Sequence, residues 1–205
     1  MELRDAVRRR RMVRRFDPDR PVPEAVVRDL VRLAVRAPSA GFSQGWDFLA
    51  LLDDADRDAF WAATDDGRPQ DAWRRGVAAA PALVLCLSHP DAYLDRYALP
   101  DKGWTDRDPG RWPVPYWDTD TAMAAMVLLL AAEDAGLGAL FFGVPGERHD
   151  AVRMALGIPS DRRLVGVVAL GHEAERVGGS ARTRVRRPLR DVLHLGRFGV
   201  SSPRP

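Results

Sequence analysis

Cysteine is almost absent from this chain of 205 residues, which contains only Cys86. Cys86 lies within an apolar run at residues 82–87, so we expect a small buried side chain rather than a nucleophile or a disulfide partner. No stretch approaches the roughly 18 apolar residues of a membrane-spanning helix, and the charged residues 1–11 precede no apolar signal-peptide core. These absences predict a reduced, cytoplasmic protein without a membrane partner.

Several catalytic signatures are also missing. Gly136-Leu137-Gly138 lacks the third glycine of a dinucleotide-binding loop, and it follows a helical pattern instead of a strand. The chain has no Gly-x-Ser-x-Gly turn and no Walker loop, so serine hydrolases and nucleoside triphosphatases lose their usual support. The histidines lie far apart without acidic partners at metal-ligand spacing, which predicts no metal site. They are His89, His149, His172 and His194.

Positive charge is carried almost entirely by arginine, since Lys102 is the only lysine among 31 basic residues, and 29 acidic residues nearly balance them. Aromatic residues do not interleave with the basic runs, so we expect no nucleic-acid partner. Arg10 and Arg14 would share one face of a helix that extended so far. Arg184 and Arg186 would share one side of an extended segment. Forked guanidinium groups from both runs would suit a phosphate, whereas the alternative is that both runs are solvated surface.

Hydrophobic periodicity predicts one α+β domain over residues 1–205, without internal repeats. Helices are expected at residues 1–11, from 21–24 to the Ala37-Pro38 stop, from 53 through 60, at 118–135 and at 148–156. Strands are expected at 48–52, 82–88 and 164–170, with a strand or loop at 139–144 and a short helix or turn at 189–195. Because strands and helices do not alternate regularly, the pattern favours helices that cover a central sheet.

Two further segments stand out in this pattern. Residues 89–117 hold prolines, tryptophans and tyrosines with neither helical nor strand period, and this excursion is too long for an idle connection. The helix at 118–135 should run through the core, because it carries the clearest apolar stripe of the chain. The stripe comprises Met123, Met126, Val127, Leu130 and Ala131.

Two motifs near the amino terminus carry the most information about function. Arg10-Arg11-Met12-Val13-Arg14-Arg15-Phe16 concentrates cations, and Ala37-Pro38-Ser39-Ala40-Gly41-Phe42-Ser43-Gln44-Gly45-Trp46 is a turn-rich loop where backbone amides can meet a ligand. Further motifs follow in Ala131-Ala132-Glu133-Asp134-Ala135-Gly136-Leu137-Gly138, Leu156-Gly157-Ile158-Pro159, Ala169-Leu170-Gly171 and Arg186-Arg187-Pro188-Leu189. In their order and spacing, these segments resemble the FMN-dependent nitroreductase family over almost the whole chain.

The resemblance implies a nitroreductase-like α+β fold with a central, mostly antiparallel sheet covered by helices, in an intertwined homodimer. It also implies FMN at the subunit interface, with arginines on its phosphate and ribityl chain and the partner's loop on its ring. The flavin would carry the chemistry, so no dedicated catalytic side chain is expected. The implied cofactor-binding residues are Arg10, Arg11, Met12, Arg14, Pro38, Ser39, Ala40, Phe42, Gln44, Gly143, Arg184 and Arg186.

The implied activity is reduction of a nitroaromatic, quinone or related conjugated small molecule by NADH or NADPH, with ping-pong hydride transfer through flavin N5. Two alternatives stay open: a dehydrogenase of a specialised pathway that uses oxygen as acceptor, and a flavin-binding protein without turnover. The aromatic acceptor would meet side chains from the loop and the excursion, although these aromatic residues could instead form a local cluster or a dimer contact. They are Phe42, Trp104, Trp112, Tyr116 and Trp117.

The chain departs from the family motif at three positions. Met12 replaces a serine, Phe42 an asparagine and Gly45 a proline. Gly41-Phe42 also resembles the loop of the flavin-destructase branch of the family. That branch needs an aspartate where Met12 stands and a serine where Gly143 stands, so the resemblance favours a reductase.

Overall fold

The computed structural model describes residues 1–67, 69–174 and 184–199. Its centre is a four-stranded sheet of β1 (Trp46–Leu51), β2 (Ala82–Ser88), β3 (Gly138–Phe142) and β4 (Arg163–Gly171). The strands lie in the order β1-β2-β4-β3, and every neighbouring pair is antiparallel. The α+β architecture with an antiparallel sheet is therefore confirmed.

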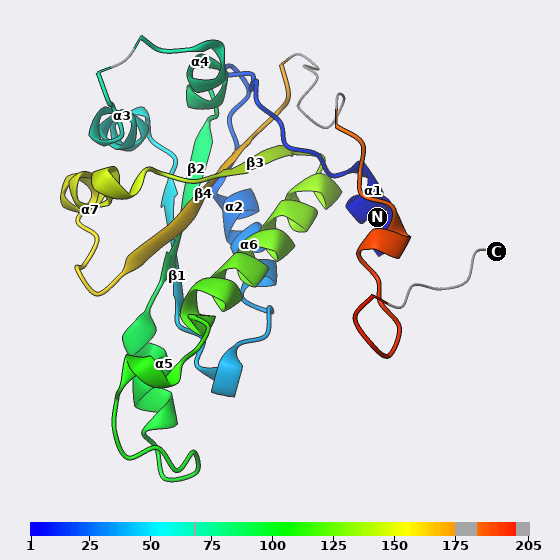
Figure 1. The fold of residues 1–205 in the computed structure, drawn as a ribbon. Coiled ribbons are helices and arrows are strands. Elements are labelled where there is room, and N and C mark those ends of the chain that lie inside the picture. Colours follow the sequence, from blue (N-terminus) through cyan, green and yellow to red (C-terminus); the bar gives the residue numbers. More distant parts are fainter. Residues whose placement is uncertain (68, 175–183, 200–205) are drawn as a thin grey trace.

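Helices cover both faces of the sheet (Figure 1). One layer contains α2 (Glu24–Ala34) and α6 (Tyr116–Asp134), and the opposite layer contains α3 (Asp54–Ala63), α4 (Ala72–Ala78) and α7 (His149–Leu156). The two remaining helices, α1 (Leu3–Arg9) and α5 (Pro90–Tyr97), lie toward the two ends of the molecule. None of the helices in the described ranges is both long and apolar enough to cross a membrane.

Strand β2 shows why the sheet holds a core on each face. Its side chains alternate between the two layers, and all of them are buried. Leu83 and Leu85 pack with Phe60, whereas Val84 and Cys86 pack with Leu128 on the other face. A strand buried on both faces reads as a continuous apolar run, so the prediction at 82–88 is confirmed, as is the burial of Cys86.

The apolar stripe on the long helix coincides only in part with the buried face of α6, since Ala131 is buried and Met123 is not. Ala124, Ala125 and Leu128 pack against the sheet, while Met123 and Met126 are 41% and 40% exposed. Almost every side of this helix is apolar, so periodicity alone could not select the face that the sheet covers. The protomer therefore presents an apolar stripe on the outside of α6.

Three other elements differ from the sequence prediction. The excursion at 89–117 contains α5, and the helix α4 was not predicted at all. Both are short helices, of 8 and 7 residues, that tertiary contacts must stabilise. Helix α1 ends at Arg9 and the chain continues extended, so Arg10 and Arg14 do not share a helical face.

Candidate functional site

The arginine-rich motif runs along one edge of the sheet. Met12 forms a parallel bridge with Ala139 of β3, and the Val13 N–H donates to the Ala139 carbonyl at 2.9 Å. Gly138 leaves room for this approach, because a Cβ at that position would lie 2.9 Å from a Val13 methyl. In an extended segment alternate residues share a side, and Arg10 and Arg14 are both half-buried.

Arg10 is the candidate anion-binding residue of this motif. Its Nη1 atom is buried and has no hydrogen-bond acceptor in the described part of the chain. A buried charged donor without an acceptor is costly, so the atom calls for an acceptor from outside the protomer. Arg14 lies in the same extended segment, and its Nη1 donates to the Met12 carbonyl at 3.0 Å.

Two other members of the motif have structural partners. Both terminal nitrogens of Arg11 donate to the carboxylate of Glu173, and this bond raises the pKa of Arg11. Met12 turns its sulfur toward the Phe141 N–H of β3, at 3.5 Å. These contacts fix the motif against β3, so Arg10 and Arg14 are its residues best placed for a ligand.

The second motif, the loop at residues 38–44, is tightly folded. The Gln44 N–H donates to Ser39 Oγ at 3.0 Å, and Ser43 Oγ donates to the Ala40 carbonyl at 2.7 Å. Gly41, Phe42 and Gln44 all have positive φ, at 61°, 56° and 50°. A left-handed conformation is rare for a side chain as large as phenylalanine, and such strained residues cluster at functional sites. The Phe42 side chain is 75% exposed.

The sheet places the two motifs at opposite edges. Met12 pairs with β3, the last strand in the order, whereas the loop at 38–44 leads into β1, the first strand. Three strand spacings separate these edges, which is about 14 Å before any side chain is counted. Figure 1 shows the two segments at different ends of the molecule. Within one protomer, Arg10 and Phe42 therefore lie beside opposite edges of the sheet.

Gly143 follows β3 and lines a pocket of about 250 Å³ with aromatic walls. Trp61 stacks parallel on Phe142 with ring centroids 5.8 Å apart, and Trp73 meets Phe142 edge-on. Trp61 Nε1 and Arg148 Nε are buried without an acceptor within the described ranges. The pocket thus offers flat apolar surface and N–H donors beside Gly143. Sequence reasoning missed Trp61, Trp73 and Arg148, whose positions carry no motif.

The tryptophans and tyrosines of the excursion gather in one cluster. Trp112 is its centre, with ring centroids 4.6 Å from Tyr97 and 5.2 Å from Trp104. Its contacts extend to Tyr93, Tyr116 and Trp117. Trp117 is buried, whereas Tyr116 is 41% exposed. Packing accounts for most of this cluster, and its contact with a substrate stays a prediction.

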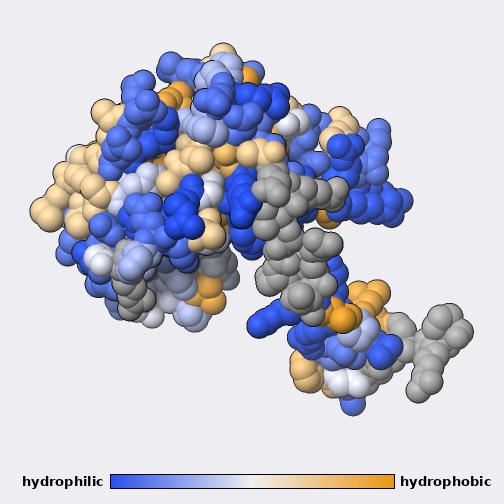
Figure 2. Space-filling model, turned by 90° about the horizontal axis from the view of Figure 1, so that it is seen from above, coloured by the Kyte–Doolittle hydropathy of each residue, from blue (hydrophilic) through white to orange (hydrophobic). Residues whose placement is uncertain are grey.

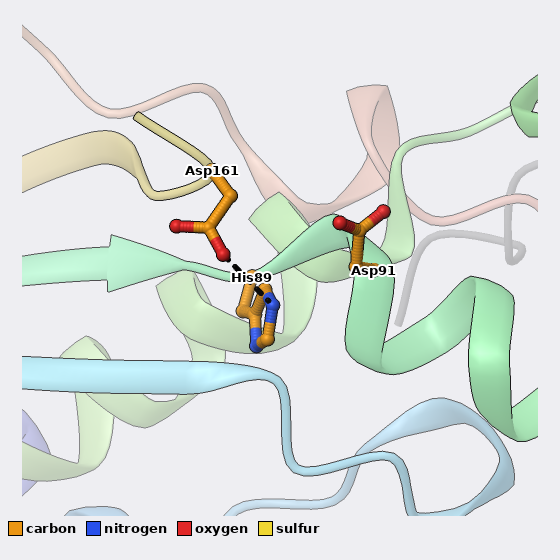
Figure 3. A group of neighbouring side chains, drawn as sticks. All are labelled: His89, Asp91 and Asp161. Atoms are coloured by element: carbon orange, nitrogen blue, oxygen red, sulfur yellow. Dashed lines mark ion pairs between the residues drawn. The ribbon is translucent and has the colours of Figure 1, made fainter. Parts of the chain in front are cut away.

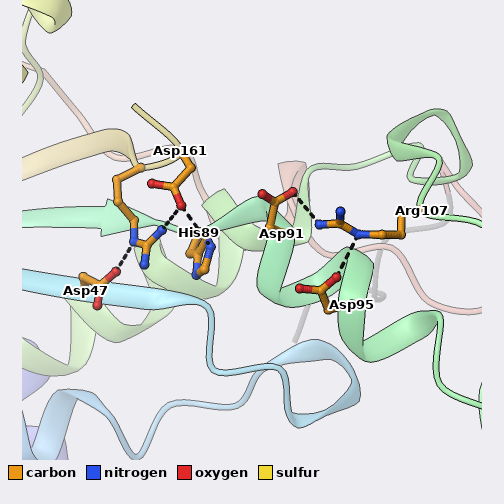
Figure 4. A network of polar contacts seen from close by, with 7 residues as sticks. Asp47, His89, Asp91, Asp95, Arg107 and Asp161 are labelled. Carbon is orange, nitrogen blue, oxygen red and sulfur yellow. Dashed lines mark hydrogen bonds and ion pairs between the residues drawn. The ribbon is translucent and has the colours of Figure 1, made fainter. Parts of the chain in front are cut away.

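The structure also brings His89 together with Asp91 and Asp161, whose ligand atoms lie within 4.8 Å of one another (Figure 3). No sequence pattern predicted the contact with Asp161, which comes from the turn before β4. Both carboxylates already have arginine partners, however: Arg162 bonds Asp161 at 2.7 Å and Arg107 bonds Asp91 at 3.0 Å (Figure 4). The group is therefore better described as an ion-pair network, and the absence of a metal site stays a prediction.

The carboxy-terminal tail carries Arg184 and Arg186, and both are exposed. Among the described residues, the hydrogen bonds of this segment lie within it, such as that from Arg187 Nη2 to the Asp191 carbonyl. Its apolar side chains are also open, with Val185 97% and Phe198 92% exposed. Figure 2 shows the tail projecting from the main body of the molecule. In the described part of the chain, no hydrogen bond or ion pair joins these two arginines to the β3 edge.

The fold and the site define a class: α+β proteins whose antiparallel sheet, covered on both faces, carries an arginine-rich edge and an aromatic pocket. A family model for the Nitroreductase family matches residues 7–172, and the chain belongs to this family of oxidoreductases. A NADH dehydrogenase of Thermus thermophilus is 31% identical over 197 residues, covering 85% of this chain and 88% of the relative.

Solved structures agree on the fold. A Desulfovibrio desulfuricans protein solved in complex with FMN superposes with a TM-score of 0.72 at 22% identity, covering 100% of this chain and 99% of that one. A nitroreductase family protein of Streptococcus pneumoniae gives a TM-score of 0.71 at 18% identity, covering 94% and 99%.

Proposed function

We propose that this protein is an FMN-dependent oxidoreductase in which two copies of the chain build each flavin site. The observation that carries the proposal is the separation of the two motifs. Arg10, whose buried Nη1 atom lacks an acceptor in the described part of the chain, lies at one edge of the sheet. The loop at residues 38–44, with its strained backbone, lies at the other edge. A second copy of the chain can place its loop against the first copy's arginines, whereas the fold of one protomer holds the two at opposite sheet edges.

The residues at the β3 edge fit the cofactor. Arg10 and Arg14 bind the phosphate and the ribityl chain, and Arg184 and Arg186 of the exposed tail join them. The aromatic pocket beside Gly143 offers a flat surface and free N–H donors to a planar heterocycle. When bound, FMN supplies two-electron chemistry at N5 between NADH or NADPH and an acceptor.

The partner's loop completes the site. Pro38, Ser39 and Ala40 of the partner subunit line the ring, and Gln44 of the partner subunit lies near it. Phe42 of the partner subunit adds an aromatic surface, since this side chain stands 75% exposed on its own protomer. The acceptor is a small conjugated molecule that stacks on Phe42. Tyr116 is the most accessible of the four further contacts, the others being Trp104, Trp112 and Trp117.

The apolar surface of the protomer supports the homodimer. Leu3 and Val7 of α1 are 69% and 53% exposed, and Met123 and Met126 extend the open apolar surface along α6. The tail adds Leu189 and Phe198. Exposed apolar surface spread over three elements is typical of a chain that pairs with another. An intertwined dimer covers all three.

Absorbance spectroscopy on the purified protein tests the proposal. We expect a yellow protein that releases FMN on denaturation and whose band near about 450 nm bleaches anaerobically when NADH or NADPH is added. Reoxidation by a nitroaromatic or a quinone then identifies a reductase, whereas reoxidation by oxygen alone identifies the dehydrogenase alternative. A colourless protein that FMN cannot reconstitute would contradict the proposal.

A further inference from the structure

Helix α5 is fastened at its amino end by the network of Figure 4. His89 lies 3.6 Å from Asp161, and Arg162 joins Asp161 to Asp47 at the start of β1. Arg107 bonds two carboxylates on α5 itself, Asp91 at 3.0 Å and Asp95 at 2.8 Å. The chain just before α5 thus has a fixed position relative to the first and last strands in the sequence.

Two tyrosines one turn apart on α5 lie close against two glycines of the loop. A Cβ at Gly45 would lie 2.5 Å from the Tyr93 ring and 2.7 Å from the His89 carbonyl oxygen. A Cβ at Gly41 would lie 2.7 Å from the Tyr97 ring. Only glycine permits these approaches, and the first explains why Gly45 stands where the family motif has proline.

A buried carboxylate joins the same elements. Asp120 of α6 is 1% exposed, and one of its oxygens accepts from the Ala40 N–H and from the Tyr93 hydroxyl, both at 2.8 Å. Burial and this bond raise the pKa of Tyr93, so its hydroxyl remains a donor. On the other side of the loop, Arg96 Nε donates to the Gly41 carbonyl at 2.9 Å.

These contacts lie at the part of the loop whose backbone conformation is least favourable. Gly41, Phe42 and Gln44 have positive φ, and two of them are not glycine. This conformation is unfavourable for Phe42 and Gln44, so the loop keeps its shape only if its surroundings hold it. Asp120 bonds the backbone just before the strained stretch, at Ala40, and Arg96 bonds its first residue, Gly41.

We propose that Asp120, with Tyr93 and Arg96, forms a clamp of positioning residues that locks residues 39–45 in their ligand-binding shape and holds out Phe42. The ligand that binds the preformed loop is the flavin of the proposed function, and this part of the inference rests on that function. The lock itself belongs to the single chain and exists without a ligand.

Hydrogen exchange of residues 39–45 in the apoprotein, read beside FMN affinity, tests the clamp. Asp120→Ala removes the acceptor, so we expect at least tenfold faster exchange in the loop and at least tenfold weaker FMN binding. Asp120→Asn keeps one acceptor oxygen and should restore both to within about threefold of wild type. Arg96→Ala removes a partly exposed side chain that lies outside the hydrophobic core, and should also accelerate exchange in the loop.

Val152→Ala is the control for general loss of stability, because Val152 is fully buried on α7 in the opposite layer. Val152→Ala and Asp120→Ala are compared at equal losses of melting temperature. At that point Val152→Ala should retain the slow hydrogen exchange of the loop and the FMN affinity of wild type. Unchanged loop exchange in Asp120→Ala and Arg96→Ala, or equal acceleration in Val152→Ala, would overturn the clamp. If the wild type binds no FMN, the proposed function fails while the exchange measurement still decides the clamp.

Discussion

At the scale of single residues, Arg10 combines a buried Nη1 atom with the absence of any acceptor in the described ranges. Arg10→Ala should weaken FMN binding by about 1.5 to 3 kcal/mol, the range for a hydrogen bond to a charged group, which is about 10- to 150-fold. Titration of the apoprotein by quenching of flavin fluorescence measures the change. Arg8→Ala removes an exposed arginine of α1 and should bind as wild type does. Equal affinity in both variants would remove Arg10 from the site.

Cys86 predicts a pH effect on stability. Burial raises the pKa of its thiol from 9.0 to about 12. As the pH rises, the unfolded chain therefore loses this proton first, and the free energy of unfolding falls between the two pKa values by about 1.4 kcal/mol per pH unit. Between about pH 8 and pH 10, urea denaturation of the wild type should show a loss about 1.4 kcal/mol larger than that of Cys86→Ala. Parallel pH profiles for the two proteins would contradict this assignment.

At the scale of elements, α6 shows what a pattern can and cannot determine. Its existence and length were predicted to within two residues, because a long apolar segment ended by Gly136 is typical of a buried helix. The apolar stripe did not identify the face that meets the sheet, since apolar residues surround the helix almost evenly. The open face with Met123 and Met126 exists because the sheet covers only one side.

That open face gives a prediction for assembly. Met126→Asp places a charge in the proposed dimer contact, so sedimentation should show a shift toward monomer at micromolar concentration. Met154→Asp is the matched control, because Met154 lies 79% exposed on α7 in the opposite layer. It should leave the dimer intact. A dimeric Met126→Asp variant would place the contact elsewhere.

Helices α4 and α5 escaped prediction for a different reason. Each is too short to form on its own, and α5 begins at Pro90 and is followed by Pro100. What stabilises α5 is contact with distant residues, such as Asp120 on Tyr93. Contacts of that kind leave no local period. By contrast, β2 is buried on both faces, and its limits followed from its apolar run alone.

At the scale of the whole molecule, the opposed motifs predict complementation between chains. A mixed dimer of Arg10→Ala with Phe42→Asp contains one site with both changes and one site with neither. If each site combines the arginines of one chain with the loop of the other, the mixed dimer should bind about half as much FMN tightly as wild type. Flavin content of the mixed dimer, isolated with two affinity tags, measures this. If each site were built from one chain alone, both flavin sites of the mixed dimer would be defective.

The sequence by itself determined the fold class, the central strand and the motifs from which an anionic aromatic cofactor was inferred, because these depend on local composition and order. Only the tertiary structure decided that Arg10 and Phe42 lie at opposite sheet edges, that α6 leaves an apolar face open, and that Asp120 holds Ala40. Each of these results from packing between residues distant in the chain. No local pattern encodes which edge, which face or which partner such packing selects.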